Sequence, residues 1–484
     1  LSDTPEPVAP EHKFSCDHPG PIRPLPGIQI GAILLVLVLT VLLTRPMAES
    51  PHREFTPLLV RPVAESSDSN ASRSVYWQTV FSLLLISMLF LFSVVNAWFF
   101  PITEPDAAWY QVKGLSFFHE VRFDSEWVDS QLRQYPPFIP LLYSWFIAFG
   151  VEPIRMVFPG FYLAIILIFY CRMREFTNNP KMSAMFTLVL ATTPYIWWHG
   201  VLPFLDLCTA VFYSAGALYW FFLMESLGVD RLKEKRRTMA FLSGLFFGLS
   251  AWNRLEFLLY GLIAVGLTLC AETSLGKEGE RDRKSFRLFF FSLLVFPTIW
   301  FLNLTSFNFS LFGSVKLVGA VGIVAWGVVL VFLSGNWKPR FSTLIKAVSL
   351  VGIIFFAFVL WDGSGTVPGW KKLSIALYRS LVIHGFYLFT VFLSVFIFFN
   401  GLKNISVLNK LFGMFLVLYP LVHFAIFSYA SPKWETFGDY LSATFIQPGN
   451  SVNLSDTRAV MSMYPLLLFF IAGIPFVRRG FDDV

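Results

Sequence analysis

The sequence predicts an all-α integral membrane protein, and two observations support this prediction. The first is composition: of 484 residues, 55% are hydrophobic and only 14% are charged, against about 25% charged residues in an ordinary soluble domain. The second is that the apolar residues form continuous runs close to the length of about 20 residues that a helix needs to cross a bilayer. A β-barrel would need alternating segments of about 10 residues, a pattern that the continuously apolar run 286–300 does not show.

The apolar runs predict a bundle of about 12 or 13 transmembrane helices. The predicted spans are 76–100, 155–171, 182–198, 204–224, 239–253, 257–271, 288–302, 311–333, 342–361, 376–399, 411–429 and 460–477. The transmembrane domain thus covers 76–477 and is followed by a short cytoplasmic tail at 478–484. Residues 1–75 are rich in proline and polar side chains, so we expect a disordered segment there with an anchor helix at 28–44 and a polar linker.

Basic loops orient the predicted spans. Lys and Arg gather in three segments, 225–238, 272–287 and 478–484. Such segments remain on the cytoplasmic side of a membrane, and alternation then places 101–154 outside. The same parity predicts that the short apolar stretch 138–150 is an interfacial helix, because a full crossing would turn the basic loop 172–181 outward.

Several function classes lack support in the sequence. The net charge of +6 is explained by the basic cytoplasmic loops, so we do not infer a nucleic-acid partner. The four cysteines have no paired spacing, which gives no disulfide framework and no zinc site. Walker loops and HExxH motifs are also missing from the sequence.

Two acids follow directly after the first predicted span. Glu104 and Asp106 stand where the chain leaves the membrane, and a carboxylate at such a low-dielectric boundary can become basic enough to act as a general base. The alternative is that Asp106 caps an ordinary solvated helix.

A second acidic position lies at the outer end of the span 204–224. Asp206 begins this span, and an acid at the mouth of a membrane helix suggests function because its burial is costly. The alternative is again a helix cap. For the neighbouring His199, a satisfied interfacial histidine is the alternative to a ligand.

Arginines complete the candidate site. Arg254 interrupts the apolar stretch 239–270, so we expect a turn there, where its guanidinium could bind a phosphate or pair with Glu256. Arg458 opens the last span in a loop that also holds Lys433, and its alternative role is snorkelling to the interface. External acids with external arginines suit a reaction in which a lipid-linked phosphate leaves while an acid deprotonates a hydroxyl.

Several short patterns follow one another in order along the chain. They are Asp106-Ala-Ala-Trp-Tyr110, the Tyr135-Pro136-Pro137 stretch with the apolar residues after it, Asp206 before its span, the glycine-containing segment 244–254, and the run from Arg458 to Pro465. In this order the chain resembles, over roughly 76–477, the GT-C superfamily of polytopic glycosyltransferases. That superfamily includes protein O-mannosyltransferases and lipid A aminoarabinose transferases.

The resemblance implies a GT-C-type bundle whose long first external loop carries interfacial helices. It also implies transfer of a sugar, with inversion, from a polyprenyl-phosphate donor to a hydroxyl of a lipid, glycan or protein on the extracytoplasmic face. Asp106 would be the catalytic base, supported by Asp206 and Glu104. The expected substrate contacts are Arg254, Arg458, Tyr110, Tyr135, Glu256, Lys433 and His199.

Metal dependence is left open by the resemblance, which implies no other cofactor. Ala107 stands where the acidic motif of the family has a second acid. Gln134 and Tyr135 stand where aminoarabinose transferases have Glu-Lys. Because both positions differ, a divalent metal is not assigned.

A polytopic transporter or flippase for lipids or sugars is the competing class, and a structural scaffold with an acidic docking loop is a third. Transporters place ionisable groups near the bilayer midplane and show repeated halves. Here the strongest acids stand at span ends, and the spans do not repeat. We therefore favour a membrane enzyme, expected in a bacterial inner membrane with its site facing the periplasm or exterior.

Overall fold

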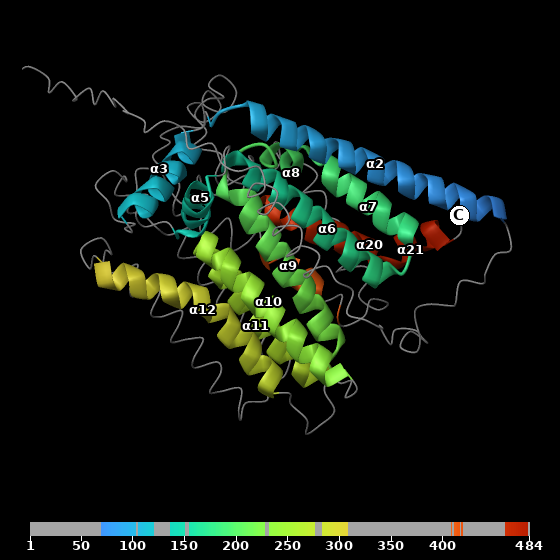
Figure 1. Ribbon diagram of the computed structural model, residues 1–484. Coiled ribbons are helices and arrows are strands. Elements are labelled where there is room, and N and C mark those ends of the chain that lie inside the picture. The colour runs from blue at the N-terminus through green and yellow to red at the C-terminus, as the bar shows by residue number, and fades with distance from the viewer. Residues whose placement is uncertain are drawn as a thin grey trace, which may run out of the picture.

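The protein is all-helical throughout the part of the chain that the computed structural model describes (Figure 1). The described residues are 69–102, 105–120, 136–150, 154–227, 232–275, 283–307, 408, 411–416, 418–419 and 460–482. The elements are α2 Ser69–Phe99, α3 Pro105–Glu120, α5 Phe138–Ala148, η2 Ile154–Met156, α6 Val157–Thr177, α7 Pro180–Thr192, α8 Pro194–His199, α9 Leu205–Glu225, α10 Lys233–Asn253, α11 Phe257–Leu275, α12 Arg283–Phe307, η5 Val460–Met463, α20 Tyr464–Ala472 and α21 Pro475–Asp482.

Three described helices are long and apolar enough to cross a membrane, judged by length and composition. They comprise Trp77–Phe99, Ile154–Thr177 and Leu205–Glu225. The three differ in position: the apolar window of α9 is 94% buried, whereas that of α2 is 22% buried. Figure 1 shows α2 along the outer edge of the bundle, and the side chains of Phe81, Leu84 and Met88 on it are exposed. The sequence prediction of an all-α membrane protein is thereby confirmed.

Two predicted spans are interrupted, and proline explains both corrections. The span 182–198 is divided between α7 and α8 at Thr193, which has a ψ of 116°. A residue that precedes proline avoids the helical region, and Pro194 follows Thr193. The span 460–477 is divided at Gly473 and Ile474, and Pro475, which cannot donate a backbone hydrogen bond, begins α21.

Other predictions of the sequence agree with the helices. The chain turns at Arg254 between α10 and α11, as its charge predicted. The stretch 138–150 forms the short helix α5, whose 11 residues extend over about 16 Å, roughly half of the hydrocarbon thickness. The interfacial position of α5 stays a prediction. The segment 1–68, with the anchor helix, and the spans 311–333, 342–361 and 376–399 lie outside the described residues.

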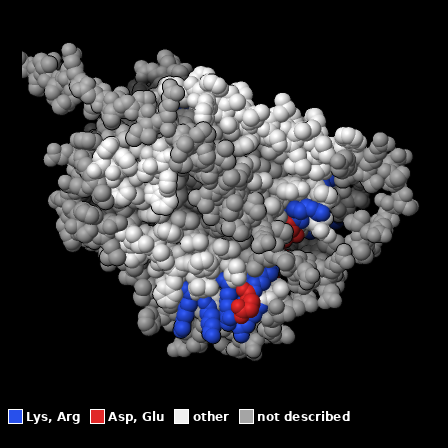
Figure 2. Space-filling model, in the orientation of Figure 1, with Lys and Arg blue, Asp and Glu red and all other residues white. Residues whose placement is uncertain are grey.

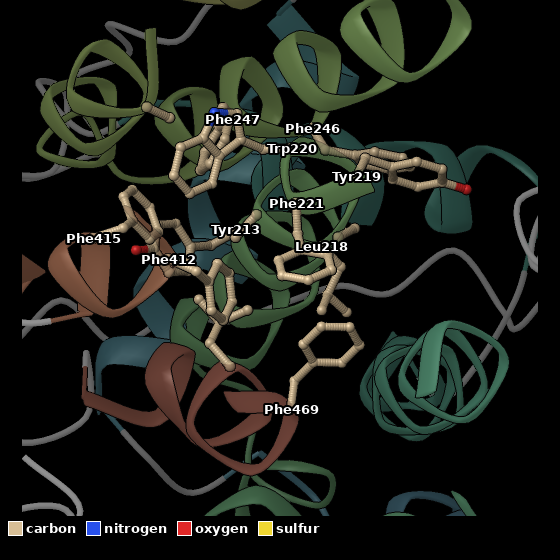
Figure 3. Packing of buried hydrophobic residues seen from close by; sticks show 14 of the residues in the cluster. Tyr213, Leu218, Tyr219, Trp220, Phe221, Phe246, Phe247, Phe412, Phe415 and Phe469 are labelled. Carbon is tan, nitrogen blue, oxygen red and sulfur yellow. The ribbon is translucent and has the colours of Figure 1, made fainter. Parts of the chain in front are cut away.

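Aromatic side chains pack around α9 and make it the axis of the bundle (Figure 3). The ring of Trp220 lies 4.9 Å from that of Phe415, and the ring of Phe221 lies 5.2 Å from that of Phe469 in α20. On the side of α10, Tyr213 meets Phe247 at 5.7 Å. Segments far apart in sequence are thus held to one helix by ring packing, which adds to the free energy of apolar burial.

Charged side chains join the helix ends opposite to Asp206. The Arg172 guanidinium lies 2.5 Å from the Glu175 carboxylate, and Lys235 lies 3.2 Å from the same side chain. Arg478 donates to the carbonyl oxygen of Phe176 at 2.9 Å. Figure 2 shows Lys and Arg side chains over the end where α10 and α12 begin. These segments belong to the loops that the positive-inside rule assigned to the cytoplasm.

Close backbone contact between α10 and α12 depends on glycine. A Cβ added at Gly244 would overlap the carbonyl oxygen of Phe289 and the hydroxyl of Ser292. A Cβ at Gly248 would lie 2.7 Å from the carbonyl oxygen of Leu293. Because the obstacles are mainly backbone atoms, the two helices must separate to accept a side chain, as at small-residue contacts of other membrane helices.

Gly244→Ala is therefore expected to lower the thermal unfolding midpoint of the detergent-solubilised protein. Gly266→Ala in α11 is the matched control, because no heavy atom lies within 4 Å of its added Cβ. The control is expected to keep or raise the unfolding midpoint, since alanine stabilises a helix by about 1 kcal/mol relative to glycine. Equal midpoints for the two variants would contradict the proposed close contact.

Candidate functional site

A buried cluster of charges lies where α9 begins and α10 ends. Asp206 is the second residue of α9 and is 2% exposed. Arg254, at the end of α10, places Nη2 2.8 Å from Asp206 Oδ1 and Nη1 3.3 Å from Glu256 Oε1. Three site residues predicted from sequence are therefore brought together. The alternative pairing of Arg254 with Glu256 is present, and the stronger contact is with Asp206.

The local backbone explains why these side chains meet. Asp206 lies in the first turn of α9, where the helix dipole favours a negative charge. Arg254 leaves the helical conformation, with φ −143° and ψ 112°. Its backbone amide still donates to the carbonyl of Ser250, and its carbonyl accepts from the amide of Phe257. The guanidinium thus projects from a tight connection whose two ends are fixed by helices.

Asn253 sets the register between the two helices. Its side chain is fully buried. Its Nδ2 donates to the carbonyl oxygen of Leu205 at 2.8 Å and to the Thr209 hydroxyl at 2.5 Å. The amide therefore joins the end of α10 to the first turn of α9, on either side of Asp206 in sequence.

Aromatic residues lie beneath the charge cluster. The rings of Tyr260 and Tyr419 stack at 4.4 Å, and Tyr213 packs against both, at 5.8 Å and 5.3 Å. Tyr419 lies close enough to Asp206, Arg254 and Glu256 for their charges to act on its hydroxyl. Two segments from late in the chain thus pack against α9. They are the described residues 411–416 and 418–419 and the η5 segment.

The helix α3 approaches the same end of α9. Tyr110 is 9% exposed and belongs to a hydrophobic cluster with Tyr143 of α5 and with Leu205 and Cys208 of α9. Asp106 is the second residue of α3, one turn before Tyr110. The structure thus places the backbone of Asp106 on a helix that packs against α5 and contributes to the same hydrophobic cluster as the first turn of α9.

The start of α5 covers the helices that carry Asp206 and Arg254. Phe138 packs edge-on against Phe212 of α9 at 5.2 Å and against Trp252 of α10 at 5.6 Å. Trp252 in turn stacks on Phe296 of α12 at 4.8 Å. The helix α5, which begins directly after Pro136 and Pro137, therefore packs on the two helices that carry the charge cluster.

Lys113 is a buried cation on the same helix as Asp106. It is 1% exposed, and its Nζ lies 5.5 Å from the ring centroid of Trp300 in α12, within the range of a cation–π contact. By helical register, Lys113 shares one face of α3 with Asp106 and Tyr110. Burial lowers the pKa of Lys113 from its ordinary value to about 7, because desolvation disfavours the ammonium form.

His199 is held within its own helix. Its Nδ1 lies 2.8 Å from the carbonyl oxygen of Tyr195, and its ring lies between those of Tyr195 and Phe204, at 5.0 Å and 5.9 Å. These contacts pack His199 against its own helix and the residue Phe204. Among the described residues, no group of three or more His, Cys, Asp and Glu side chains could hold a metal ion.

Four predicted site residues lie outside the part of the chain that the structure describes. They are Glu104, Tyr135, Lys433 and Arg458.

Sequence reasoning missed three residues of the site. Asn253 and Lys113 are polar residues whose burial depends on distant helices. Tyr419 lies within an apolar run that carries no local sign of its packing against Tyr213 and Tyr260. A weak signal existed for Lys113, whose spacing of seven residues from Asp106 places both on one helical face.

Comparisons with known proteins give two distant structural likenesses. No family profile and no curated protein matches the sequence. The chain is similar to two structures of the Archaeoglobus fulgidus oligosaccharyltransferase: a complex with Zn and sulfate (14% identity, TM-score 0.44) and the apo form (12%, 0.43). Each covers 82% of this chain, which spans 53% and 56% of those chains, about half their length. A likeness this distant assigns neither family nor activity.

The buried ammonium of Lys113 is expected to make stability depend on pH. The pKa of Lys113 is 10.5 in the unfolded chain and about 7 in the folded protein, so the folded protein releases this proton at a lower pH. Between these values the unfolded state binds more protons, so the free energy of unfolding rises with pH. Below pH 7 both states are protonated, and the cost of burying the ammonium is constant.

Thermal unfolding between about pH 6 and about pH 9 measures this effect. The wild-type midpoint should include a rise with pH that Lys113→Met removes. Lys181→Met, at the start of α7, is the control and should retain the wild-type profile. An unchanged slope in the Lys113 variant would show that Lys113 keeps an ordinary pKa.

Proposed function

We propose that the protein is a membrane glycosyltransferase that transfers a sugar, with inversion, from a polyprenyl-phosphate donor to a hydroxyl acceptor outside the cytoplasm. The observation that carries the proposal is the buried Asp206–Arg254 pair at the outer ends of α9 and α10. Burying a charge in a membrane helix is costly, and such ionisable residues usually mark functional sites. The basic helix ends lie on the other side, so this pair belongs to the extracytoplasmic side.

The proposed reaction has one bond-forming and one bond-breaking event. The acceptor oxygen forms a bond to the anomeric carbon while the bond between that carbon and the phosphate oxygen breaks. The leaving phosphate takes the electron pair, and the Asp106 carboxylate takes the hydroxyl proton. Arg254 stabilises the charge that develops on the phosphate.

The contacts of Arg254 suggest how a phosphate would enter. Asp206 holds one side of the guanidinium at 2.8 Å and is 2% exposed, whereas Glu256 holds the other side at 3.3 Å and is 27% exposed. We infer that donor phosphate displaces Glu256 and leaves the Asp206 contact in place. Asp206 then orients the guanidinium, which offers paired donors that match phosphate oxygens.

Substitution of the proposed base is the first test. Asp106→Asn should lower transfer of radiolabelled sugar from a polyprenyl-phosphate donor by about 100-fold or more, the usual contribution of a general base. Elution from gel filtration and thermal midpoint should stay unchanged. Glu234→Gln, an exposed carboxylate at the cytoplasmic start of α10, is the control. Full transfer by the Asp106 variant would exclude this base.

Substitution of the proposed phosphate contact is the second test. Arg254→Ala should raise the KM for the lipid-phosphate donor by roughly tenfold or more, because charge-assisted contacts to phosphate are lost. Arg172→Ala also removes a buried arginine, which is 3% exposed, but does so at the cytoplasmic end. This control separates the loss of donor binding from a general loss of stability.

Unchanged donor dependence in the Arg254 variant would reject the phosphate role. Reconstitution in sealed vesicles distinguishes a glycosyltransferase from a transporter or flippase. Movement of the donor lipid across the bilayer without transfer of its sugar would identify a flippase.

A further inference from the structure

Arg155 connects three chain segments at the outer end of the bundle. It lies in η2, immediately before α6, and is 5% exposed. Its Nη1 donates to the carbonyl oxygens of Phe100 at 2.8 Å and Pro101 at 2.7 Å. Its Nη2 donates to the carbonyl oxygen of Val201 at 2.5 Å and lies 3.4 Å from Asn96 Oδ1. One guanidinium therefore joins the end of α2, the start of α6 and the α8–α9 connection.

The acceptors are groups that the helices leave without partners. Phe100 and Pro101 follow the last residue of α2, and Val201 lies in the turn after α8. Carbonyl groups at a helix end have no intrahelical donor, and near the hydrocarbon water cannot fully replace one. A cation there is also favoured by the helix dipole. Only arginine presents five fixed donors that can reach several such carbonyls at once.

The same two connections lead to the two acids of the site. Asp106 follows Pro101 by five residues, and Asp206 follows Val201 by five residues. Each acid is the second residue of its helix. Five residues reach at most about 17 Å, so each anchored carbonyl limits how far from Arg155 the helix that carries the acid can begin.

We propose that Arg155 is a positioning residue for glycosyl transfer. It fixes the α2–α3 and α8–α9 connections to one point and thereby sets the distance between Asp106 and Asp206. This inference rests on the proposed function. It adds a residue that touches neither donor nor acceptor and acts through the backbone that carries both acids.

The kinetic test uses Arg155→Lys. Lysine keeps the charge but has three donors on a flexible stem, so it cannot join all three segments in one geometry. The variant should lower kcat by about tenfold to 100-fold, the effect of small misplacement of catalytic groups, with the KM for the donor nearly unchanged. The matched control is Arg172→Lys, a buried arginine at the cytoplasmic end, which should keep the wild-type kcat.

A distance measurement tests the inference without any activity. Spin labels at Ile102→Cys, in the α2–α3 connection, and Trp198→Cys, at the end of α8, report the separation of the two anchored segments. The distance distribution should be narrow in the otherwise wild-type chain and in Arg172→Lys, and broad in Arg155→Lys. A narrow distribution in the Arg155 variant, or a wild-type kcat, would overturn the inference.

A milder variant covers the case in which Arg155→Lys does not fold. Asn96→Leu removes the side-chain acceptor at 3.4 Å and leaves Arg155 in place. It should broaden the same distribution slightly and lower kcat about twofold; no change in either would overturn the inference. If the wild-type chain transfers no sugar but the labels respond to Arg155, the proposed function fails while the anchoring by Arg155 stands.

Discussion

The contact between Asp206 and Arg254 is the constraint on which the outer end of the molecule depends. At 2.8 Å it neutralises two charges that would each be costly to bury alone. Asn253 supports the contact by joining α10 to the first turn of α9. Aromatic packing along α9 would tolerate small sliding of its neighbours, but the polar contacts at the outer end accept only one register.

The two ends of the bundle use charge differently. At the end predicted to be cytoplasmic, Glu175 lies between Arg172 and Lys235, and this excess of cations is typical of loops that stay in the cytoplasm. At the outer end, Arg254 lies between two carboxylates. This cluster of one arginine and two acids carries a net negative charge, which suits the orientation of a guanidinium.

Much of the fold could be predicted because span length and apolar composition are local properties of the chain. The Arg254 turn was predictable for the same reason, since a charge interrupts an apolar run. The breaks at Thr193 and Gly473 were missed because hydropathy ignores proline stereochemistry. Asp206 and Arg254 were each singled out, yet their contact and the burial of Lys113 arise from packing between distant helices. Glu104, Tyr135, Lys433 and Arg458 remain predictions.

The order of α9 and α10 in the chain has a consequence for biogenesis. Synthesis delivers Asp206 to the membrane 48 residues ahead of Arg254, the same separation as that of the bonded Leu205 and Asn253. Before α10 is made, Arg254 cannot pair with Asp206. If the insertion machinery retains α9 until α10 is complete, the two charges can meet before the helices enter lipid.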